Sequence, residues 1–164
     1  MAYYTGRTGA LFLTTAAEGG ANPTASEKAL KLRDWSLDTS LELLETTTAD
    51  TAVKSYTPGS VSSTGSATVL YYRREGTTST EPGTQFDQFL SKLMKTSASG
   101  VTESDRVGMV LRLGETAGVG TDIKDDIAFN AYITSAGLKV NTGELSSVAI
   151  QFTVDGPFRE LIEA

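Results

Sequence analysis

The stretch LKLRDWSLDTSLELLETTTADTAVKSYTPGSVSSTGSATVLYY, residues 30–72, decides the fold. It holds two segments with strong strand patterns, joined by about twenty residues that are mostly Thr, Ser, Gly and Pro. A connection with so few apolar residues cannot bury itself, and compact domains rarely keep one of this length without a function. We therefore predict that residues 46–63 form a long loop that projects as an arm and contacts a partner, which indicates assembly before catalysis. Tyr56, Pro58 and Val61 are its sizeable apolar residues near the tip, and they are the predicted subunit contacts.

The first strand segment, residues 29–45, alternates between apolar and polar residues with a period of two. Its apolar phase changes at Arg33 and Asp34, which predicts a β-bulge there, or a strand buried first on one face and then on the other. A helix is the competing interpretation of LELLE, residues 41–45, but the alternation is longer than the helical match, so we predict a strand. The second segment, residues 64–73, carries large side chains on both faces near its end, so neither face is predicted to be simply solvent-exposed.

The rest of the chain adds strands and one helix. Alternating or apolar patterns predict strands at residues 9–15, 107–113, 127–134 and 148–155. An amphipathic helix is predicted from Thr84 to the SASG segment at 97–100, because apolar residues recur there at helical spacing: Phe86, Phe89, Leu90, Leu93 and Met94. The predicted fold class is mainly β, a single domain over residues 1–164. We expect an antiparallel β-sandwich or barrel of about six to eight strands, with one flanking α-helix and a long projecting loop.

The composition narrows the function. The chain contains no His and no Cys, which excludes the Ser-His-Asp and Cys-His arrangements and nearly all zinc and haem sites. It has no phosphate-binding glycine motif, no apolar run long enough to span a bilayer and no signal-peptide pattern. A net charge of −6 argues against a surface that grips nucleic-acid phosphates, since such surfaces are basic. We predict no enzyme activity, no cofactor and no membrane contact.

A cluster of aspartates is one candidate site. Asp122, Asp125 and Asp126 carry the carboxylate oxygens that Ca²⁺ and Mg²⁺ prefer. However, Lys124 lies inside the cluster and the spacing of a calcium-binding loop is absent. We interpret the cluster as a solvated turn that leads into a strand, without a metal.

A second acidic set lies on the first strand segment, where Asp34, Asp38 and Glu42 share one face of the predicted strand. A carboxylate pair for general acid–base catalysis is one interpretation, but nothing in the sequence supplies the groups that would orient a substrate. An acidic, hydrophilic surface is the preferred interpretation. Trp35, on the opposite face, is predicted to anchor the core.

These residues resemble the bacteriophage tail tube, or major tail, proteins. The resemblance rests on a Trp-Ser strand, the LETTT strand end, the SYTPG loop and the TGSATVLYY return strand, all within residues 32–72. It continues in AYITSAGLKVNTGELSSVAIQFTVDGP, residues 131–157, which is similar to that family's closing pattern of strand, GEL turn, strand and Gly-Pro. The two segments cover somewhat under half of the chain and contain no catalytic signature.

The resemblance implies hexameric rings whose inner sheets join into one continuous β-barrel, and rings that stack into a tube for genome delivery. DNA would pass through without specific binding, because an acidic lumen repels phosphates. Asp34, Asp38 and Glu42 are the predicted lumen face. The resemblance also implies a virion location after synthesis in the host cytoplasm, and other tail proteins as partners: the tape measure, the terminator and, where there is one, the sheath.

Other classes of function are left open by the sequence. Another virion or secretion-tube component, such as a neck protein or the tube protein of a type VI secretion system, shares the β-sandwich fold. A carbohydrate- or receptor-binding β domain would need an exposed aromatic cluster, whereas the six Tyr lie mostly in predicted strands.

Overall fold

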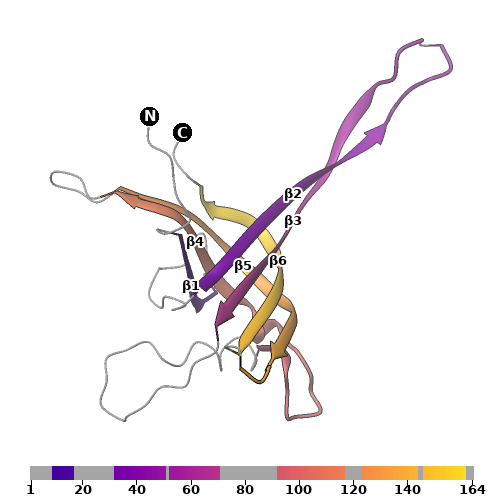
Figure 1. Ribbon diagram of the computed structural model, residues 1–164. Coiled ribbons are helices and arrows are strands. Elements are labelled where there is room, and N and C mark those ends of the chain that lie inside the picture. Colours follow the sequence, from indigo (N-terminus) through magenta and orange to yellow (C-terminus); the bar gives the residue numbers. More distant parts are fainter. Residues whose placement is uncertain are drawn as a thin grey trace.

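The computed structural model describes residues 9–16, 32–50, 52–70, 92–116, 123–143 and 146–161 (Figure 1). The strands within these ranges are β1 Ala10–Thr15, β2 Leu32–Glu45, β3 Tyr56–Leu70, β4 Val107–Thr116, β5 Ile123–Lys139 and β6 Ser147–Glu160. A 3₁₀ turn, η1 Glu103–Asp105, precedes β4. In the described part of the chain, no helix is long and apolar enough to cross a membrane.

The strands form one antiparallel sheet in the order β1-β4-β5-β6-β3-β2. Hairpins connect β2 to β3, β4 to β5 and β5 to β6, as expected when neighbours in the chain become neighbours in the sheet. β2 and β3 are the exception to the compact arrangement, because they continue together as a ribbon far beyond the other strands (Figure 1).

The hydrophobic core lies on one face of the sheet. Alternate residues of β1, β3, β4, β5 and β6 are almost completely buried there: Leu11, Leu13, Ala67, Val69, Val107, Met109, Leu111, Phe129, Ala131, Ile133, Val148, Ile150 and Phe152. Within this cluster Phe129 and Phe152 stack with their ring centroids 5.7 Å apart. Trp35 and Leu37 of β2 pack against the same cluster as Leu11 of β1, although β1 and β2 are the opposite edges of the sheet. The sheet therefore curls around a shared core. Trp35, which was predicted to anchor the core, is partly buried and packs against it.

A second, smaller cluster lies on the other face of β1, β4 and β5. It consists of Ala10, Phe12, Val110 and Ala128, all at most 7 % exposed. Val110 is paired with Phe12 on one side and with Ala128 on the other. This half of the sheet is therefore buried on both faces, whereas β2, β3 and β6 keep one exposed face.

The mainly β prediction is confirmed. Each strand expected from alternation is present, LELLE is part of β2, and the bulge expected at Arg33 and Asp34 coincides with a shift of the β2–β3 register between Leu32 and Asp34. The described strands form a single curled sheet, so the two-sheet form of the prediction is not confirmed.

The predicted loop was too long. β3 begins at Tyr56, so residues 56–63 are strand and the arm is a β-hairpin whose connection spans only residues 46–55. Thr, Ser, Gly and Pro dominate residues 57–63, and their own pattern does not predict a strand. Pairing with residues 39–44 of β2 imposes it, because strand formation depends on cross-strand context more than on intrinsic preference.

The predicted helix falls largely outside the described residues, and this includes Phe86, Phe89 and Leu90. Among the described residues of the predicted helix, Lys92 and Leu93 are helical, and Leu93 is half-buried. Met94 is outside the helix and 65 % exposed, so the helix ends before the SASG segment instead of at it.

Candidate assembly surfaces

The exposed face of the sheet is lined by hydroxyl, amide and carboxylate groups. Because side chains alternate along each strand, these groups lie opposite the core residues. The register places Asp38, Thr64, Thr153 and Tyr132 in one row across four strands. We call this surface the polar face, and it comprises Asp34, Ser36, Asp38 and Ser40 of β2, Ser62, Thr64, Ser66 and Thr68 of β3, Gln151 and Thr153 of β6, and Tyr132 and Ser135 of β5.

Hydroxyl groups of β2 and β3 hydrogen-bond across the polar face. The Oγ atoms of Ser36 and Ser66 are 2.9 Å apart, and those of Ser40 and Ser62 are 3.0 Å apart. Cross-strand hydroxyl pairs of this kind stabilise a sheet by about 0.2–1 kcal/mol each. Each pair uses the O–H of one serine and one acceptor site of the other, so these bonds hold β2 against β3.

The predicted lumen residues lie along β2 on the polar side of the sheet. Asp34 and Asp38 are exposed, and Glu42 accepts a hydrogen bond from Ser60 Oγ at 3.0 Å through its Oε2. Successive carboxylates are four residues apart, about 13 Å along a strand. They are not brought together, so the arrangement gives an acidic stripe and no acid–base pair. Asp38 lines an open hollow of about 350 Å³ with Thr134 and other residues of the polar face.

Gly65 leaves the space that the Phe152 ring occupies against β3. A Cβ atom at this position would lie 2.4 Å from Cζ of Phe152 and 2.5 Å from the backbone oxygen of Ser36. Phe152 is 1 % exposed and stacked on Phe129, so its ring has little room to move. Glycine is therefore required for this ring to lie against β3.

The four-strand sheet β5-β6-β3-β2 has two unpaired edges in the described part of the chain. β2 is the last strand in the sheet order, and its outer side has no strand partner. β5 pairs with β4 only as far as Ala131, which leaves residues 132–139 without a partner on that side. Unpaired edges of this length are templates for pairing with another chain.

In the structure the arm is longer than the predicted loop of residues 46–63 and comprises residues 39–63. Within this range β3 pairs with β2 alone, because its pairing with β6 begins at Thr64. At the tip the backbone N–H of Thr46 donates to the carbonyl oxygen of Ser55 at 2.9 Å. Each of the predicted contact residues is exposed: Tyr56 is 50 % exposed, Val61 is 63 % exposed and Pro58 is also in the exposed class. Their role as subunit contacts stays a prediction.

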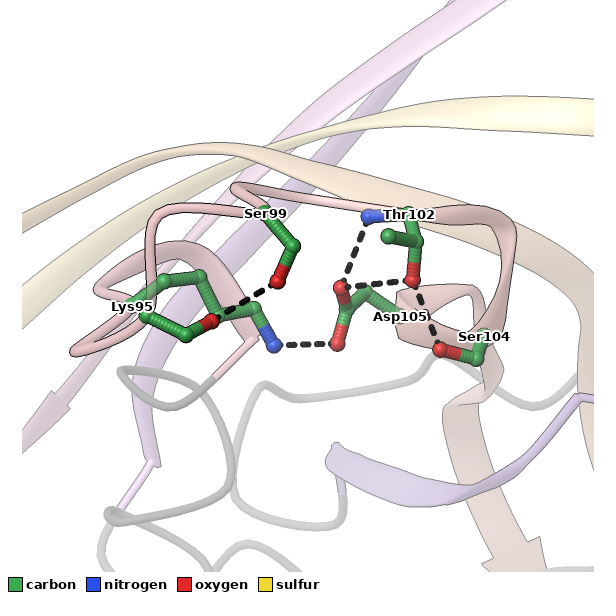
Figure 2. Close-up of polar contacts among 6 residues, drawn as sticks. Lys95, Ser99, Thr102, Ser104 and Asp105 are labelled. Atoms are coloured by element: carbon green, nitrogen blue, oxygen red, sulfur yellow. Dashed lines mark hydrogen bonds and ion pairs between the residues drawn. The ribbon is translucent and has the colours of Figure 1, made fainter.

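Residues 94–106 form a turn at the end of the molecule opposite the arm (Figure 1). Figure 2 shows how Asp105 holds it: the carboxylate pairs with the ammonium group of Lys95 and accepts a hydrogen bond from the backbone N–H of Thr102 at 2.9 Å. Two hydrogen bonds lower the pKa of Asp105 below its ordinary value of 3.8. The bond from Lys95 has the larger effect, and the bond from the backbone N–H of Thr102 has the smaller one. Arg106 Nη1 donates to Asp155 Oδ2 at 3.0 Å and ties the turn to β6.

The aspartate cluster of the sequence is not simply a solvated turn. Asp125 and Asp126 lie within β5, and Asp126 accepts two hydrogen bonds from Arg112 at 2.7 and 2.8 Å. Both side chains are nearly buried, at 8 % exposed for Arg112 and 11 % for Asp126. The solvated interpretation was therefore wrong for Asp126. Asp122 lies outside the described residues, and within them no group of carboxylates could hold a metal ion.

Sequence reasoning missed two features of these surfaces. Leu41 and Leu43, which were predicted as ordinary strand residues, are 50 % and 55 % exposed on the arm. The polar residues of β5 and β6 alternate with core residues in the sequence, but their alignment with β2 depends on the sheet register and has no local signal. The long alternating run through residue 43 was the available signal that β2 extends beyond the core.

No family model and no curated protein matches the chain. Solved structures do match. The SPP1 tail tube, determined by solid-state NMR and cryo-EM, is 14 % identical with a TM-score of 0.61, and the match covers 94 % of this chain and 77 % of that one. The virion of the native gene transfer agent particle contains a chain that is 9 % identical with a TM-score of 0.59, covering 94 % and 95 %.

The tail of the empty gene transfer agent particle, refined with C6 symmetry, gives 10 % identity, a TM-score of 0.56 and coverage of 94 % and 96 %. Similarity at these identities is a similarity of fold. The chain has the fold of phage tail tube proteins, as its sequence resemblance predicted.

Proposed function

We propose that this protein is a structural subunit of a phage tail tube, in which hexameric rings stack into a conduit for genome delivery. One observation carries the proposal: a four-strand sheet with one buried face, one polar face and two edges that no other described strand pairs with. The shared fold with the SPP1 tail tube supports it, and the C6 symmetry used for the gene transfer agent tail supports six copies to a ring.

Strand direction explains how copies join. Neighbours in the sheet β5-β6-β3-β2 are antiparallel throughout, so the two edge strands of this even-numbered set run in opposite directions. β2 of one copy therefore pairs antiparallel with residues 132–139 of β5 in the next copy, while all copies keep the same orientation. Repetition of this contact closes a ring and removes the exposed edges.

In this ring the polar face lines the channel. Asp34, Asp38 and Glu42 give the wall negative charge, which repels DNA phosphates. The protein therefore acts as a passive conduit without a cofactor. Its proposed partners are further copies of itself and the other tail proteins: the tape measure, the terminator and, in a contractile tail, the sheath.

Sedimentation velocity of the purified protein tests the proposal. We expect monomer at low concentration together with large assemblies that grow as concentration rises, because association through strand edges and stacked rings follows mass action. A species that stays strictly monomeric at high concentration across a range of salt contradicts the ring and the tube.

A further inference from the structure

The two edges that join in the proposed ring each expose a leucine on the core side of the sheet. On β2, Leu41 is 50 % exposed, and on β5, Leu138 is 52 % exposed. Alternation places Leu41 on the same side as Leu37, and Leu138 lies on the same side as its completely buried partner Val148. A strand of a second copy laid along either edge would cover the leucine there and remove apolar surface from water.

The register of β2 against β5 of the next copy has few possible values. A displacement by an odd number of residues would turn the apolar side of one strand to the polar side of the other, so the displacement is even. Within one copy Asp38 and Tyr132 lie in the same row, and a ring without displacement would repeat that row. Because β4 already occupies β5 as far as Ala131, a displacement can move the partner of Asp38 only toward Lys139.

One residue of β5 drops out of the count. The register between β5 and β6 shifts after Ile133, which leaves Thr134 as an extra residue on β5. Displacements of two, four and six positions therefore place Asp38 opposite one of three residues on the polar side of β5: Ser135, Gly137 or Lys139.

Closure of the ring favours the larger displacements. Strands in closed barrels tilt by about 35–45° from the barrel axis. Each copy contributes four strands, spaced about 4.8 Å apart, and each residue advances about 3.3 Å along its strand. Displacements of two, four and six positions per copy then give tilts of about 19°, 35° and 46°. Two positions give too little tilt, which leaves four or six.

The apolar side chains select between these two registers. With four positions, Leu138 lies opposite Leu37 of the neighbouring copy, and Leu41 lies opposite Ile133. Each half-exposed leucine then meets a large apolar side chain, and such cross-strand pairs stabilise a sheet. With six positions, Leu138 lies opposite Thr39 and loses this apolar contact. Four positions therefore fit the two edges best.

We propose that copies join in the ring with a displacement of four residues, so that Asp38 of one copy lies directly opposite Gly137 of the next. The inference rests on the proposed tube function and adds the register of the contact within the ring. We call this contact the seam, in which residues 36–42 of β2 lie beside residues 132–139 of β5 in the next copy. The leucine contacts close the core side of the seam, while the polar face continues across it from copy to copy.

Engineered disulfides test the register, because the wild-type chain contains no Cys. Residues directly opposite each other in an antiparallel pair have Cα atoms about 4.5–5.5 Å apart, within the range of about 4.4–6.8 Å that a disulfide spans. Diagonal neighbours are about 7–8 Å apart and cannot be bridged without movement of the backbone. Cross-linking therefore separates registers that differ by two positions.

Gly137→Cys is combined in turn with Ser36→Cys, Asp38→Cys or Ser40→Cys. All four positions are exposed, and a Cβ atom at Gly137 has no close contact, the backbone oxygen of Ala149 being 3.8 Å away. Each variant is assembled, checked for tubes by negative-stain microscopy, oxidised and run on a denaturing gel without reductant. The single variant Gly137→Cys is the control for cross-links that do not cross the seam.

We expect Asp38→Cys with Gly137→Cys to give a ladder of covalent oligomers that ends at six, because each copy is then bridged to both neighbours in a six-fold ring. The pairs of Gly137→Cys with Ser36→Cys and with Ser40→Cys correspond to displacements of two and six, and they should stay monomeric on the gel. Ser40→Cys with Ser135→Cys reports the same register as the Asp38 pair through conservative substitutions. It should give the same ladder, and it decides the result if the loss of the Asp38 carboxylate disturbs assembly.

A ladder from Ser36→Cys or Ser40→Cys with Gly137→Cys, in place of the expected one, overturns the displacement of four while leaving the ring intact. Tubes in which none of the pairs cross-links overturn the seam between β2 and β5. Wild-type protein that forms neither rings nor tubes refutes the proposed function itself, and the register with it.

Discussion

Gly65→Ala is expected to destabilise the fold because there is no space for a side chain at this position. The added methyl group would lie 2.4 Å from the Phe152 ring and 2.5 Å from the backbone oxygen of Ser36. The ring is held by its stacking on Phe129, and the carbonyl moves only if β2 moves. Overpacking of this kind costs about 1–3 kcal/mol, offset by about 0.4–1 kcal/mol because alanine restricts the unfolded chain. We expect a net loss of about 1–2 kcal/mol.

Gly137→Ala is the matched control, since Gly137 also lies in a strand and its nearest atom, the backbone oxygen of Ala149, is 3.8 Å from the new methyl group. Its stability should be unchanged or higher by up to about 1 kcal/mol. Urea unfolding of dilute monomer, followed by the fluorescence of Trp35, measures both variants. Addition of Phe152→Leu should recover part of the loss from Gly65→Ala, because it relieves the ring contact and not the carbonyl contact. Equal stabilities for the two alanine variants would refute the close approach of Phe152 to β3.

Four further results are expected. Arg112→Met should cost about 3–5 kcal/mol in urea unfolding, because it leaves the nearly buried carboxylate of Asp126 without its partner, and a cost below about 1 kcal/mol would contradict this. Asp105→Asn should reduce stability at neutral pH, and the difference from wild type should shrink as pH falls below 3.8 towards the lower pKa of the folded state, since a lowered pKa stabilises the fold only while the carboxylate is ionised. A difference that does not change with pH would contradict that role. Deletion of residues 52–60 should leave a folded monomer by circular dichroism that builds no tubes, and normal tubes would show that the arm is not a subunit contact. Substitution of the acidic stripe (Asp34, Asp38 and Glu42) by lysine should leave assembly intact and slow DNA release from phage particles. Unchanged release would place these residues outside the channel.

Local pattern was sufficient to predict the strands in which every second residue enters the main core, including β4, whose other face is also buried. β4, β5 and β6 alternate cleanly because every second residue enters the core, and the change of phase at Arg33 was enough to locate a bulge. The start of β3 could not be predicted in the same way. Residues 57–62 face solvent on most sides, so burial imposes no alternation on them and only their pairing with β2 makes them strand.

The sequence predicted the exposure of single residues on the candidate surfaces, but not which residues of different strands lie side by side. The exposure of Asp34 and Asp38 follows from their place opposite Trp35 and Leu37, which is a local property. The alignment of Asp38 with Thr64 and Thr153 depends on a sheet order that brings β6 next to β3. The pairing of Asp126 with Arg112 likewise joins two strands through their register, so the aspartate cluster alone gave no sign of it.

Cryo-electron microscopy of the purified protein at high concentration tests the central claim most directly. With four strands from each of six copies, spaced about 4.8 Å apart and tilted by about 40°, the wall that carries the polar face should be about 40–50 Å in diameter. We predict hollow tubes of stacked six-fold rings with such an inner wall, on which Asp34, Asp38 and Glu42 face the channel. Solid fibres, or tubes whose inner wall is not built from β2, β3, β5 and β6, would contradict the account.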